Sequence, residues 1–272
     1  MGDGVRKPDA SGGSLPAAVA IQGLSKSFGH GVQALVDLQL AIEEGEFLCL
    51  LGPSGCGKST LLRLIAGLER PSTGLIRWWG QGAGIIGQEG YRVGIVFQEA
   101  TLMPWTDVRR NVRLPLDLEG CPRTTAEQRV AQILAMVGLE AFADAYPHEL
   151  SGGMQMRAAL ARALVTTPRL LLMDEPFGAL DELTRNRLNS ELLALWARQH
   201  ATVVFVTHSM AEAVFLGSRV LVMSPRPGRL AGELSIDEPY PRSAAFRTSM
   251  HHLALVRQLE QMLVAACGDE VP

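Results

Sequence analysis

The chain has 272 residues, of which 47% are hydrophobic and 19% are charged, and its net charge is -3. This length suffices for one large domain with a sizeable core, and the acidic balance does not favour nucleic-acid binding. No apolar run approaches the roughly 18–20 residues that span a bilayer, and the N-terminal stretch lacks the apolar core of a signal peptide. Four cysteines without metal or redox spacing indicate free thiols, so we expect a cytosolic protein.

Short apolar runs alternate with helical patterns along most of the chain. Residues 1–18 are dominated by Gly, Ser, Pro and charge, which predicts a disordered tail. Four continuous apolar runs are typical of strands buried on both faces: residues 47–51, 170–173, 203–206 and 220–223. Strands that alternate with helices predict an α/β fold with a mainly parallel sheet, whose core we expect to comprise residues 19–97 and 166–234.

Three regions depart from this alternation. Residues 74–97 are rich in Gly, Ile, Val and Trp and predict short strands with turns, although the stretch 77–92 is idiosyncratic. Residues 98–165 predict a helical sub-domain, in which Val130, Ile133, Leu134 and Val137 form one helix face that ends at Gly138. Residues 235–272 suffice for a short helical extension, with an amphipathic helix expected from about Phe246 to Leu263.

A phosphate-binding loop follows the first apolar run. Gly52-Pro53-Ser54-Gly55-Cys56-Gly57-Lys58-Ser59 fits G-x-x-x-x-G-K-[ST] between a predicted strand and a predicted helix, as the motif requires. Its glycines allow backbone N–H groups to surround phosphates at a helix N-terminus. We expect Lys58 to reach the β- and γ-phosphates, Ser59 to ligate Mg²⁺ and Thr60 to adjoin the nucleotide. The alternative is a glycine-rich turn that matches by coincidence.

Cys56 lies beside the predicted helix N-terminus, where the pKa of a thiol tends to fall. On this basis we expect alkylation of Cys56 to block ATP binding and bound ATP to protect the thiol. An inert buried thiol is the alternative.

Two adjacent acidic residues, Asp174 and Glu175, end the second apolar run. Ligands of open α/β sheets bind beside the C-terminal ends of the strands. We therefore expect Asp174 to hold the Mg²⁺ shell and Glu175 to polarise the attacking water. A solvated strand end is the alternative.

The segment Leu150-Ser151-Gly152-Gly153-Met154-Gln155 completes a resemblance to the ATPase subunit of ATP-binding cassette (ABC) transporters. The resemblance implies a P-loop NTPase (RecA-like) α/β core with a mainly parallel sheet, a small antiparallel β sub-domain and the inserted α-helical sub-domain. In this family the segment is the signature sequence, which contacts the nucleotide held by the opposite subunit of a dimer. Ser151 and Gly153, with Gly152 between them, are then expected to meet a γ-phosphate; from the residues alone, Ser151 predicts a helix N-cap, and the two roles are compatible.

Further residues match the family in order. Gln98 fits the glutamine that touches Mg²⁺ and links the core to the helical sub-domain, and Ala179-Leu180-Asp181 fits the loop where the subunits meet. His208 fits the histidine that holds the γ-phosphate, although a lone histidine at a strand end is more often structural. Phe28 fits the aromatic residue that stacks on adenine, and core packing against the first strand is its alternative.

The surroundings of Gln98 and of Asp174 are similar to those of bacterial importers, in the branch for nitrate, sulfonate, taurine and bicarbonate. In this family the stretch that contains Leu102, Pro104 and Trp105 faces the coupling helices of integral membrane permease subunits, although Trp105 fits the sub-domain core equally well. The resemblance implies a peripheral homodimer or paired ATPase at the cytoplasmic face of the membrane. It would hydrolyse ATP with Mg²⁺ to energise uptake of a small solute, with an indirect partner in a solute-binding protein. A soluble ABC-type ATPase and a small-molecule kinase are the alternatives.

Overall fold

The computed structural model describes residues 17–88, 90–199 and 201–268. The tail predicted at residues 1–18 lies largely outside this range, and its last two residues, Ala17 and Ala18, already belong to the first strand. None of the helices in the described ranges is both long and apolar enough to cross a membrane.

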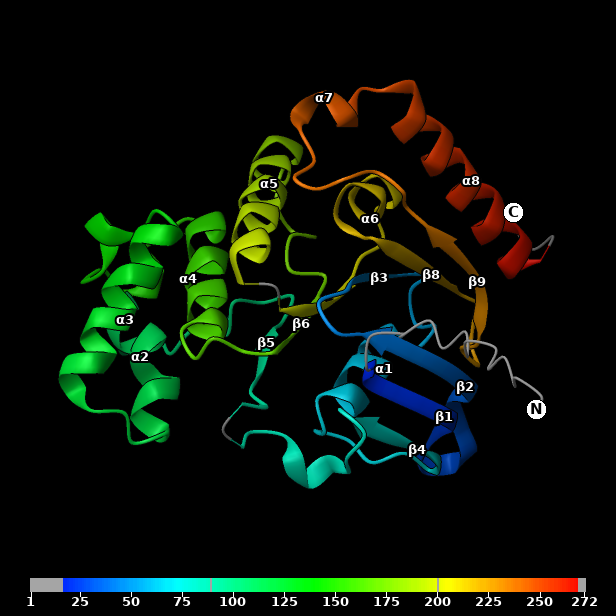
Figure 1. Cartoon of the computed structure of the whole chain (residues 1–272), viewed down its shortest axis with the longest axis horizontal. Coiled ribbons are helices and arrows are strands. Elements are labelled where there is room, and N and C mark those ends of the chain that lie inside the picture. Colours follow the sequence, from blue (N-terminus) through cyan, green and yellow to red (C-terminus); the bar gives the residue numbers. More distant parts are fainter. Residues whose placement is uncertain (1–16, 89, 200, 269–272) are drawn as a thin grey trace, which may run out of the picture.

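The centre of the molecule is a six-stranded sheet (Figure 1). Its order is β5 (Val93–Val96), β6 (Leu170–Asp174), β7 (Thr202–Val206), β3 (Phe47–Leu51), β8 (Arg219–Met223) and β9 (Leu230–Ser235). All neighbouring pairs are parallel except β8 and β9. The four apolar runs of the sequence are therefore strands of one mainly parallel sheet, as predicted. They carry apolar residues on both faces because hydrophobic clusters lie on both sides of the sheet.

A separate antiparallel sheet packs beside α1 (Lys58–Ile65). Its order is β2 (Val32–Glu43), β1 (Ala17–Phe28) and β4 (Thr73–Trp78). The short strands with turns predicted for residues 74–97 are confirmed as β4 and β5, and the segment between them holds a 3-10 turn at Ala83–Ile85. Two aromatic residues of the segment, Trp79 and Tyr91, lie 4.7 and 5.3 Å from the guanidinium of Arg169. The idiosyncratic stretch therefore contributes cation–π contacts that fasten it to the core.

Three helices form the part of the molecule on the left of Figure 1: α2 (Val108–Leu118), α3 (Arg123–Met136) and α4 (Gly152–Leu164). The predicted end of α3 is confirmed, since Gly138 adopts a left-handed φ of 68° just after it. The α4 helix lies so close to β5 that a Cβ on Gly94 would stand 2.7 Å from the Ala163 carbonyl oxygen. A glycine is thus required where the helical region meets the sheet.

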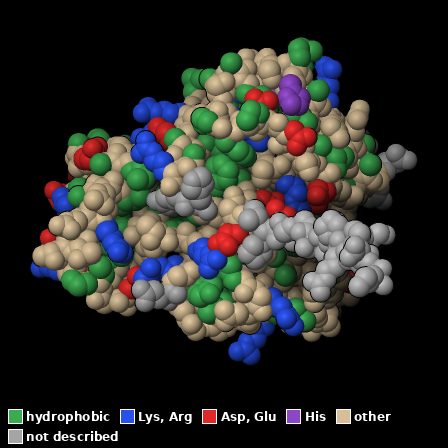
Figure 2. Space-filling model, viewed as in Figure 1, with side chains coloured by type: hydrophobic (Ala, Val, Ile, Leu, Met, Phe, Trp, Pro, Cys, Tyr) green, Lys and Arg blue, Asp and Glu red, His purple; other side chains and the backbone are tan. Residues whose placement is uncertain are grey.

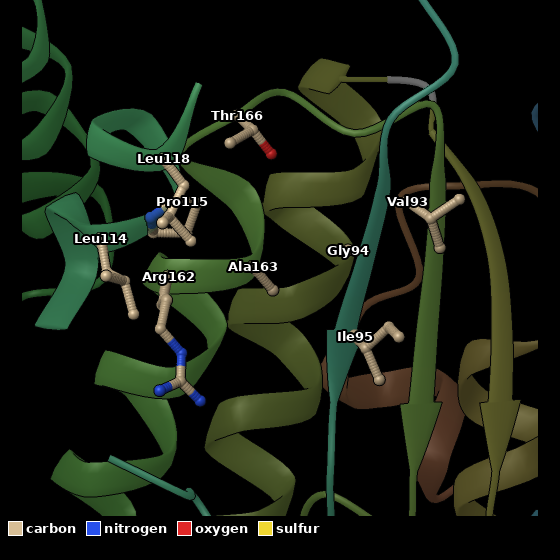
Figure 3. Close-up of a pocket in the computed structure, with 9 residues that line it drawn as sticks. All are labelled: Val93, Gly94, Ile95, Leu114, Pro115, Leu118, Arg162, Ala163 and Thr166. Carbon is tan, nitrogen blue, oxygen red and sulfur yellow. The ribbon is translucent and has the colours of Figure 1, made fainter. Parts of the chain in front are cut away.

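A pocket of about 320 Å³ lies beside this contact, with side chains of α2 and α4 facing β5 (Figure 3). Its walls are mostly apolar, and its one charged side chain, Arg162, donates to the carbonyl oxygens of Ala100 and Thr101 at 3.0 and 2.8 Å. Arg162 therefore fastens the signature helix α4 to the segment that follows Gln98.

The predicted C-terminal amphipathic helix is present as α8 (Met250–Cys267), which begins four residues later than expected and follows a separate short helix, α7 (Ala244–Arg247). The break occurs because Ser249 caps α8, with its hydroxyl accepting a hydrogen bond from the His252 N–H at 3.0 Å. Both helices pack near α6 (Met210–Leu216). On the face that Figure 2 shows, basic and acidic side chains are interspersed rather than gathered into a basic patch.

Candidate active site

The glycine-rich loop joins β3 to α1, so its backbone leaves the sheet at the C-terminal end of a central strand. Gly55 and Gly57 have φ angles of 76° and 103°, which side chains with a Cβ rarely adopt. Lys58 is 5% exposed, and its ammonium donates to the carbonyl oxygens of Gly52 and Pro53 at 2.7 and 3.0 Å. The loop is thus wound around the lysine that the motif assigns to phosphate.

The loop forms one wall of a cleft of about 430 Å³. Nine of the predicted site residues line this cleft: Phe28, Ser54, Gly55, Gly57, Lys58, Ser59, Thr60, Gln98 and Glu175. Two further lining residues, Ala34 and Arg226, were not predicted from the sequence. The missed residues are adjacent because the Gly228 N–H donates to the Ala34 carbonyl at 2.9 Å. The place of Arg226 in the cleft depends on this contact between segments that are distant in the sequence, so no local pattern indicates it.

Phe28 ends β1 at the mouth of the cleft, and 42% of its surface is exposed. This exposure is incompatible with the alternative of core packing. The ammonium of Lys26 lies 4.9 Å from the centre of the Phe28 ring and pairs with Glu69 at 2.8 Å. An accessible aromatic face at this position is available for stacking.

Asp174 is absent from the described lining of the cleft, but it is joined to Ser59, which lines it. The Ser59 hydroxyl donates to Asp174 Oδ1 at 3.0 Å. Burial raises the pKa of Asp174, and the hydrogen bond from Ser59 opposes this shift. Together with the amide of Gln98, which lines the same cleft, these groups offer the hard oxygen donors that Mg²⁺ prefers.

Glu175 and His208 form the second polar pair of the site. Glu175 Oε2 lies 3.1 Å from His208 Nδ1. Glu175 has a φ angle of 45°, an unfavourable conformation for a residue with a Cβ, and its N–H donates to the Val206 carbonyl at 3.0 Å. Strain of this kind is tolerated where the surrounding structure fixes the residue, and it is common at functional sites.

Three predicted residues of the loop, Gly52, Pro53 and Cys56, are absent from the described lining of the cleft. A Cβ on Gly52 would stand 3.0 Å from the Met223 carbonyl oxygen, and Pro53 supplies a carbonyl to Lys58. Cys56 is 1% exposed, and burial raises the pKa of its thiol. The expectation of a lowered pKa is therefore wrong: desolvation outweighs the nearby Lys58, which acts in the opposite direction.

The signature residues Ser151, Gly152 and Gly153 lie at the start of α4, outside the described lining of the cleft. Ser151 is exposed and caps α4, its hydroxyl accepting from the Met154 N–H at 3.4 Å, so the predicted N-cap is confirmed. Within the described part of the chain, none of Ser151, Gly152 and Gly153 lines the cleft at the phosphate loop. Gly152 instead lines a groove of about 550 Å³ that also holds Gln98 and Leu180.

The same groove contains Leu102 and Pro104, two of the residues predicted to receive a membrane partner. Trp105 follows them and is 73% exposed. This exposure is incompatible with the alternative that Trp105 is part of the sub-domain core, and it leaves a large apolar side chain in solvent near the groove.

Comparisons with known proteins agree with this geometry. An uncharacterized ABC transporter ATP-binding protein of Methanocaldococcus jannaschii is 44% identical over 264 residues, which is 96% of this chain and 95% of that protein. A nitrate import ATP-binding protein of Synechocystis sp. is 46% identical over 220 residues, covering 79% of this chain and 82% of the relative. A taurine import ATP-binding protein of Rhizobium johnstonii is 48% identical over 210 residues, covering 77% of this chain and 79% of the relative.

Among solved structures, the chain is similar to the dimeric post-hydrolysis state of an ATP-binding cassette bound to ADP and Pi. The TM-score is 0.71 at 32% identity, and the match covers 81% of this chain and all of that chain. The family model described as ABC transporter matches residues 35–178, which include the phosphate loop, the signature segment and the acidic pair. The chain therefore belongs to the ABC transporter family and is one of its ATP-binding, ATP-hydrolysing proteins.

Proposed function

We propose that two copies of this chain close around two ATP molecules, each held by one phosphate loop and completed by the signature turn of the other copy. The observation that carries this proposal is the exposed signature turn, which is excluded from its own cleft among the described residues. A related cassette is dimeric in its post-hydrolysis state, which supports the same arrangement.

In each site, Lys58 and the N-terminus of α1 would neutralise the phosphates, and Phe28 would stack on adenine. Ser59, Asp174 and Gln98 would hold Mg²⁺. When bound, the ion supplies positive charge against the β- and γ-phosphate oxygens. Gly52, Pro53 and the buried Cys56 would support the conformation of the loop.

Glu175 would accept a proton from the attacking water while the water oxygen bonds to the γ-phosphorus and the bond to the β-phosphate oxygen breaks. His208 would hold the γ-phosphate. The 3.1 Å contact between His208 Nδ1 and Glu175 Oε2 supports a joint role of the two side chains. Ser151 and Gly153 of the second copy would donate to the γ-phosphate from the opposite side.

Mixing two inactive variants tests the shared site. Lys58→Ala removes the phosphate contact and Ser151→Ala weakens the signature contact, so each homodimer should lose most activity. In a mixed dimer one site keeps both residues. Equal mixing should therefore restore about a quarter of the original rate, because half of randomly paired dimers are mixed and each keeps one intact site. A mixture that stays inactive contradicts the shared site.

We also propose that the partner of this ATPase is a membrane permease for the import of a small solute, such as nitrate, a sulfonate or taurine. Relatives with 41–48% identity carry import names for these solutes. The groove that holds Leu102 and Pro104, with the exposed Trp105 nearby, supports a docking site for a short cytoplasmic helix of the permease, which would place the chain at the cytoplasmic face of the membrane.

Co-expression with a candidate importer permease from the same genome tests this partner. Trp105→Ala should reduce co-purification and solute-dependent ATP hydrolysis, while basal hydrolysis persists. The exposed Phe142→Ala, on the same helical region, is a matched control and should keep both. Equal recovery of the permease with both variants contradicts the proposed docking site.

A further inference from the structure

A buried carboxyl group lies directly behind the turn that carries His208. Glu212 is on α6 and is only 6% exposed, and it takes no part in the lining of the nucleotide cleft. Burial raises the pKa of Glu212. Since burying a carboxyl group destabilises a fold unless the group is hydrogen-bonded, its contacts indicate what it contributes.

The carboxyl group of Glu212 holds the residue before His208. The Thr207 hydroxyl donates to Glu212 Oε2, and Thr207 is 2% exposed. The other oxygen, Oε1, accepts no hydrogen bond from the described residues. Among the described residues, the Thr207 hydroxyl therefore supplies the side-chain hydrogen bond of this carboxyl group, and the side chain of Asn189 also lies beside it.

The same hydroxyl also holds the residue after His208. Thr207 Oγ1 accepts from the Ser209 N–H at 3.0 Å, and the Ser209 hydroxyl accepts from the Glu212 N–H at 3.3 Å. The Thr207 N–H donates to the Leu50 carbonyl at 3.1 Å, which ties the turn to the central strand β3. Both chain neighbours of His208 are thus fixed, while the His208 side chain itself is 55% exposed.

We propose that Thr207 and Glu212 are positioning residues for hydrolysis, which hold the His208 backbone so that its imidazole meets Glu175 and the γ-phosphate. The inference rests on the proposed role of His208. An exposed imidazole keeps its place through its backbone anchor and its 3.1 Å contact with Glu175. Loosening the anchor should therefore lower turnover without changing how the phosphate loop binds ATP.

Thr207→Val tests the proposal because it removes the hydroxyl and keeps the shape. The matched control is Thr202→Val at the opposite end of β7, where the residue is 0% exposed and its hydroxyl accepts from the Gly45 N–H at 3.0 Å. We expect Thr207→Val to lower kcat roughly ten- to hundredfold, with KM for ATP within about twofold. Thr202→Val should lower Tm and leave kcat within about twofold. Equal kcat values for the two variants overturn the proposal.

Glu212 provides a second, independent measurement. Glu212→Ala should lower kcat as Thr207→Val does, whereas Glu212→Gln should restore most of it, because the amide oxygen still accepts from Thr207. Equal loss in the two Glu212 variants contradicts the proposed contact. The Tm of each variant shows whether a lower kcat reflects a destabilised fold or a displaced His208 in a folded protein.

A double-mutant cycle with His208→Ala shows whether the effect passes through the histidine. If Thr207 acts by positioning His208, Thr207→Val should cause no further loss of kcat in the His208→Ala background. A full additional loss in that background overturns the inference. Unchanged turnover of His208→Ala alone would instead contradict the proposed role of His208.

Discussion

The Ser59 hydroxyl donates to Asp174 Oδ1 at 3.0 Å, which joins the start of α1 to the end of β6 across 115 positions of sequence. Two motifs that the sequence shows separately are thus parts of one site. The raised pKa of Asp174 shows that this site holds a carboxylate at a position where burial opposes its charge. Such groups favour ligand binding at some expense of stability.

Asp174→Asn should stabilise the nucleotide-free protein at pH 7. Its folded pKa lies above the ordinary value of 3.8, so ionised Asp174 destabilises the fold at neutral pH, and this effect vanishes as the pH falls below that value. We expect Tm to rise by about 1–2 °C at pH 7 and the gain to disappear near pH 4. Thermal melts across this range measure the difference.

A control variant and a measurement with bound nucleotide complete these thermal melts. Asp181→Asn should act in the opposite direction at pH 7, because hydrogen bonds from Thr184 lower the pKa of Asp181. With Mg²⁺ and ATP present, the wild-type chain should gain more in Tm than Asp174→Asn does. A lower Tm of nucleotide-free Asp174→Asn at pH 7 would contradict the first expectation.

Glu175→Gln should slow hydrolysis about 10²–10⁴-fold, the range of a general-base contribution, while ATP binding persists. Because closed dimers then outlive the hydrolysis step, they should accumulate with ATP. Phosphate release and size-exclusion chromatography measure the two effects. The exposed acid at the start of α5, Glu182, provides the control Glu182→Gln, which should turn over normally. Near-normal turnover of Glu175→Gln would contradict the role of Glu175 as the general base.

Cys56 should react slowly with alkylating reagents at neutral pH, since burial both raises its pKa and shields the thiol. Cys121 and Cys267 are more accessible and should be modified first. Raising the pH should accelerate modification of Cys56, because more thiolate forms. Peptide mass spectrometry over time gives the order, and Cys56 as the first cysteine modified at pH 7 would show that its pKa is not raised.

Gly228→Ala should distort the phosphate loop, because a Cβ there would stand 2.0 Å from the Cys56 carbonyl oxygen. We expect a loss of about 1–3 kcal/mol of stability and at least about tenfold weaker ATP binding. Gly82→Ala, in open space at a φ angle of -78°, is the matched control and should stay within about 0.5 kcal/mol. Fluorescent-nucleotide titration and denaturant unfolding separate the two effects, and equal affinities for the two variants would be inconsistent with this contact.

Arg242→Ala should destabilise the protein by about 3 kcal/mol or more, because it leaves buried carbonyl groups without donors. The guanidinium donates to the carbonyl oxygens of Val214, Phe215 and Gly217 at 2.8–3.0 Å and thereby caps the C-terminal end of α6. The exposed Arg229→Ala is the control and should change stability by less than about 0.5 kcal/mol. Urea unfolding of both variants measures the difference, and an unchanged midpoint for Arg242→Ala would contradict the capping role.

Much of the fold follows from local patterns. The apolar runs predicted the buried strands β3, β6, β7 and β8, and the spacing of apolar residues with Gly138 predicted α3 and its end. The amphipathic helix expected from about Phe246 to Leu263 is present as α8, but it begins at Met250 because Ser249 caps it, which the apolar periodicity does not reveal. The short strands expected within residues 74–97 are β4 and β5, whereas the contacts of Trp79 and Tyr91 with Arg169, which hold the stretch between them, follow from no local pattern.

By itself, the sequence determined the kind of chemistry. The phosphate loop, the acidic strand end and the signature segment are each a short continuous stretch of sequence. Their residue types and spacing therefore indicate nucleotide binding before the tertiary structure is known. Only the tertiary structure decided the environment of each group: that Cys56 is buried, that Trp105 is exposed, that Arg226 reaches the cleft and that Thr207 meets Glu212. The physical reason is that desolvation and hydrogen bonding depend on atoms brought together from distant segments, which no local pattern encodes.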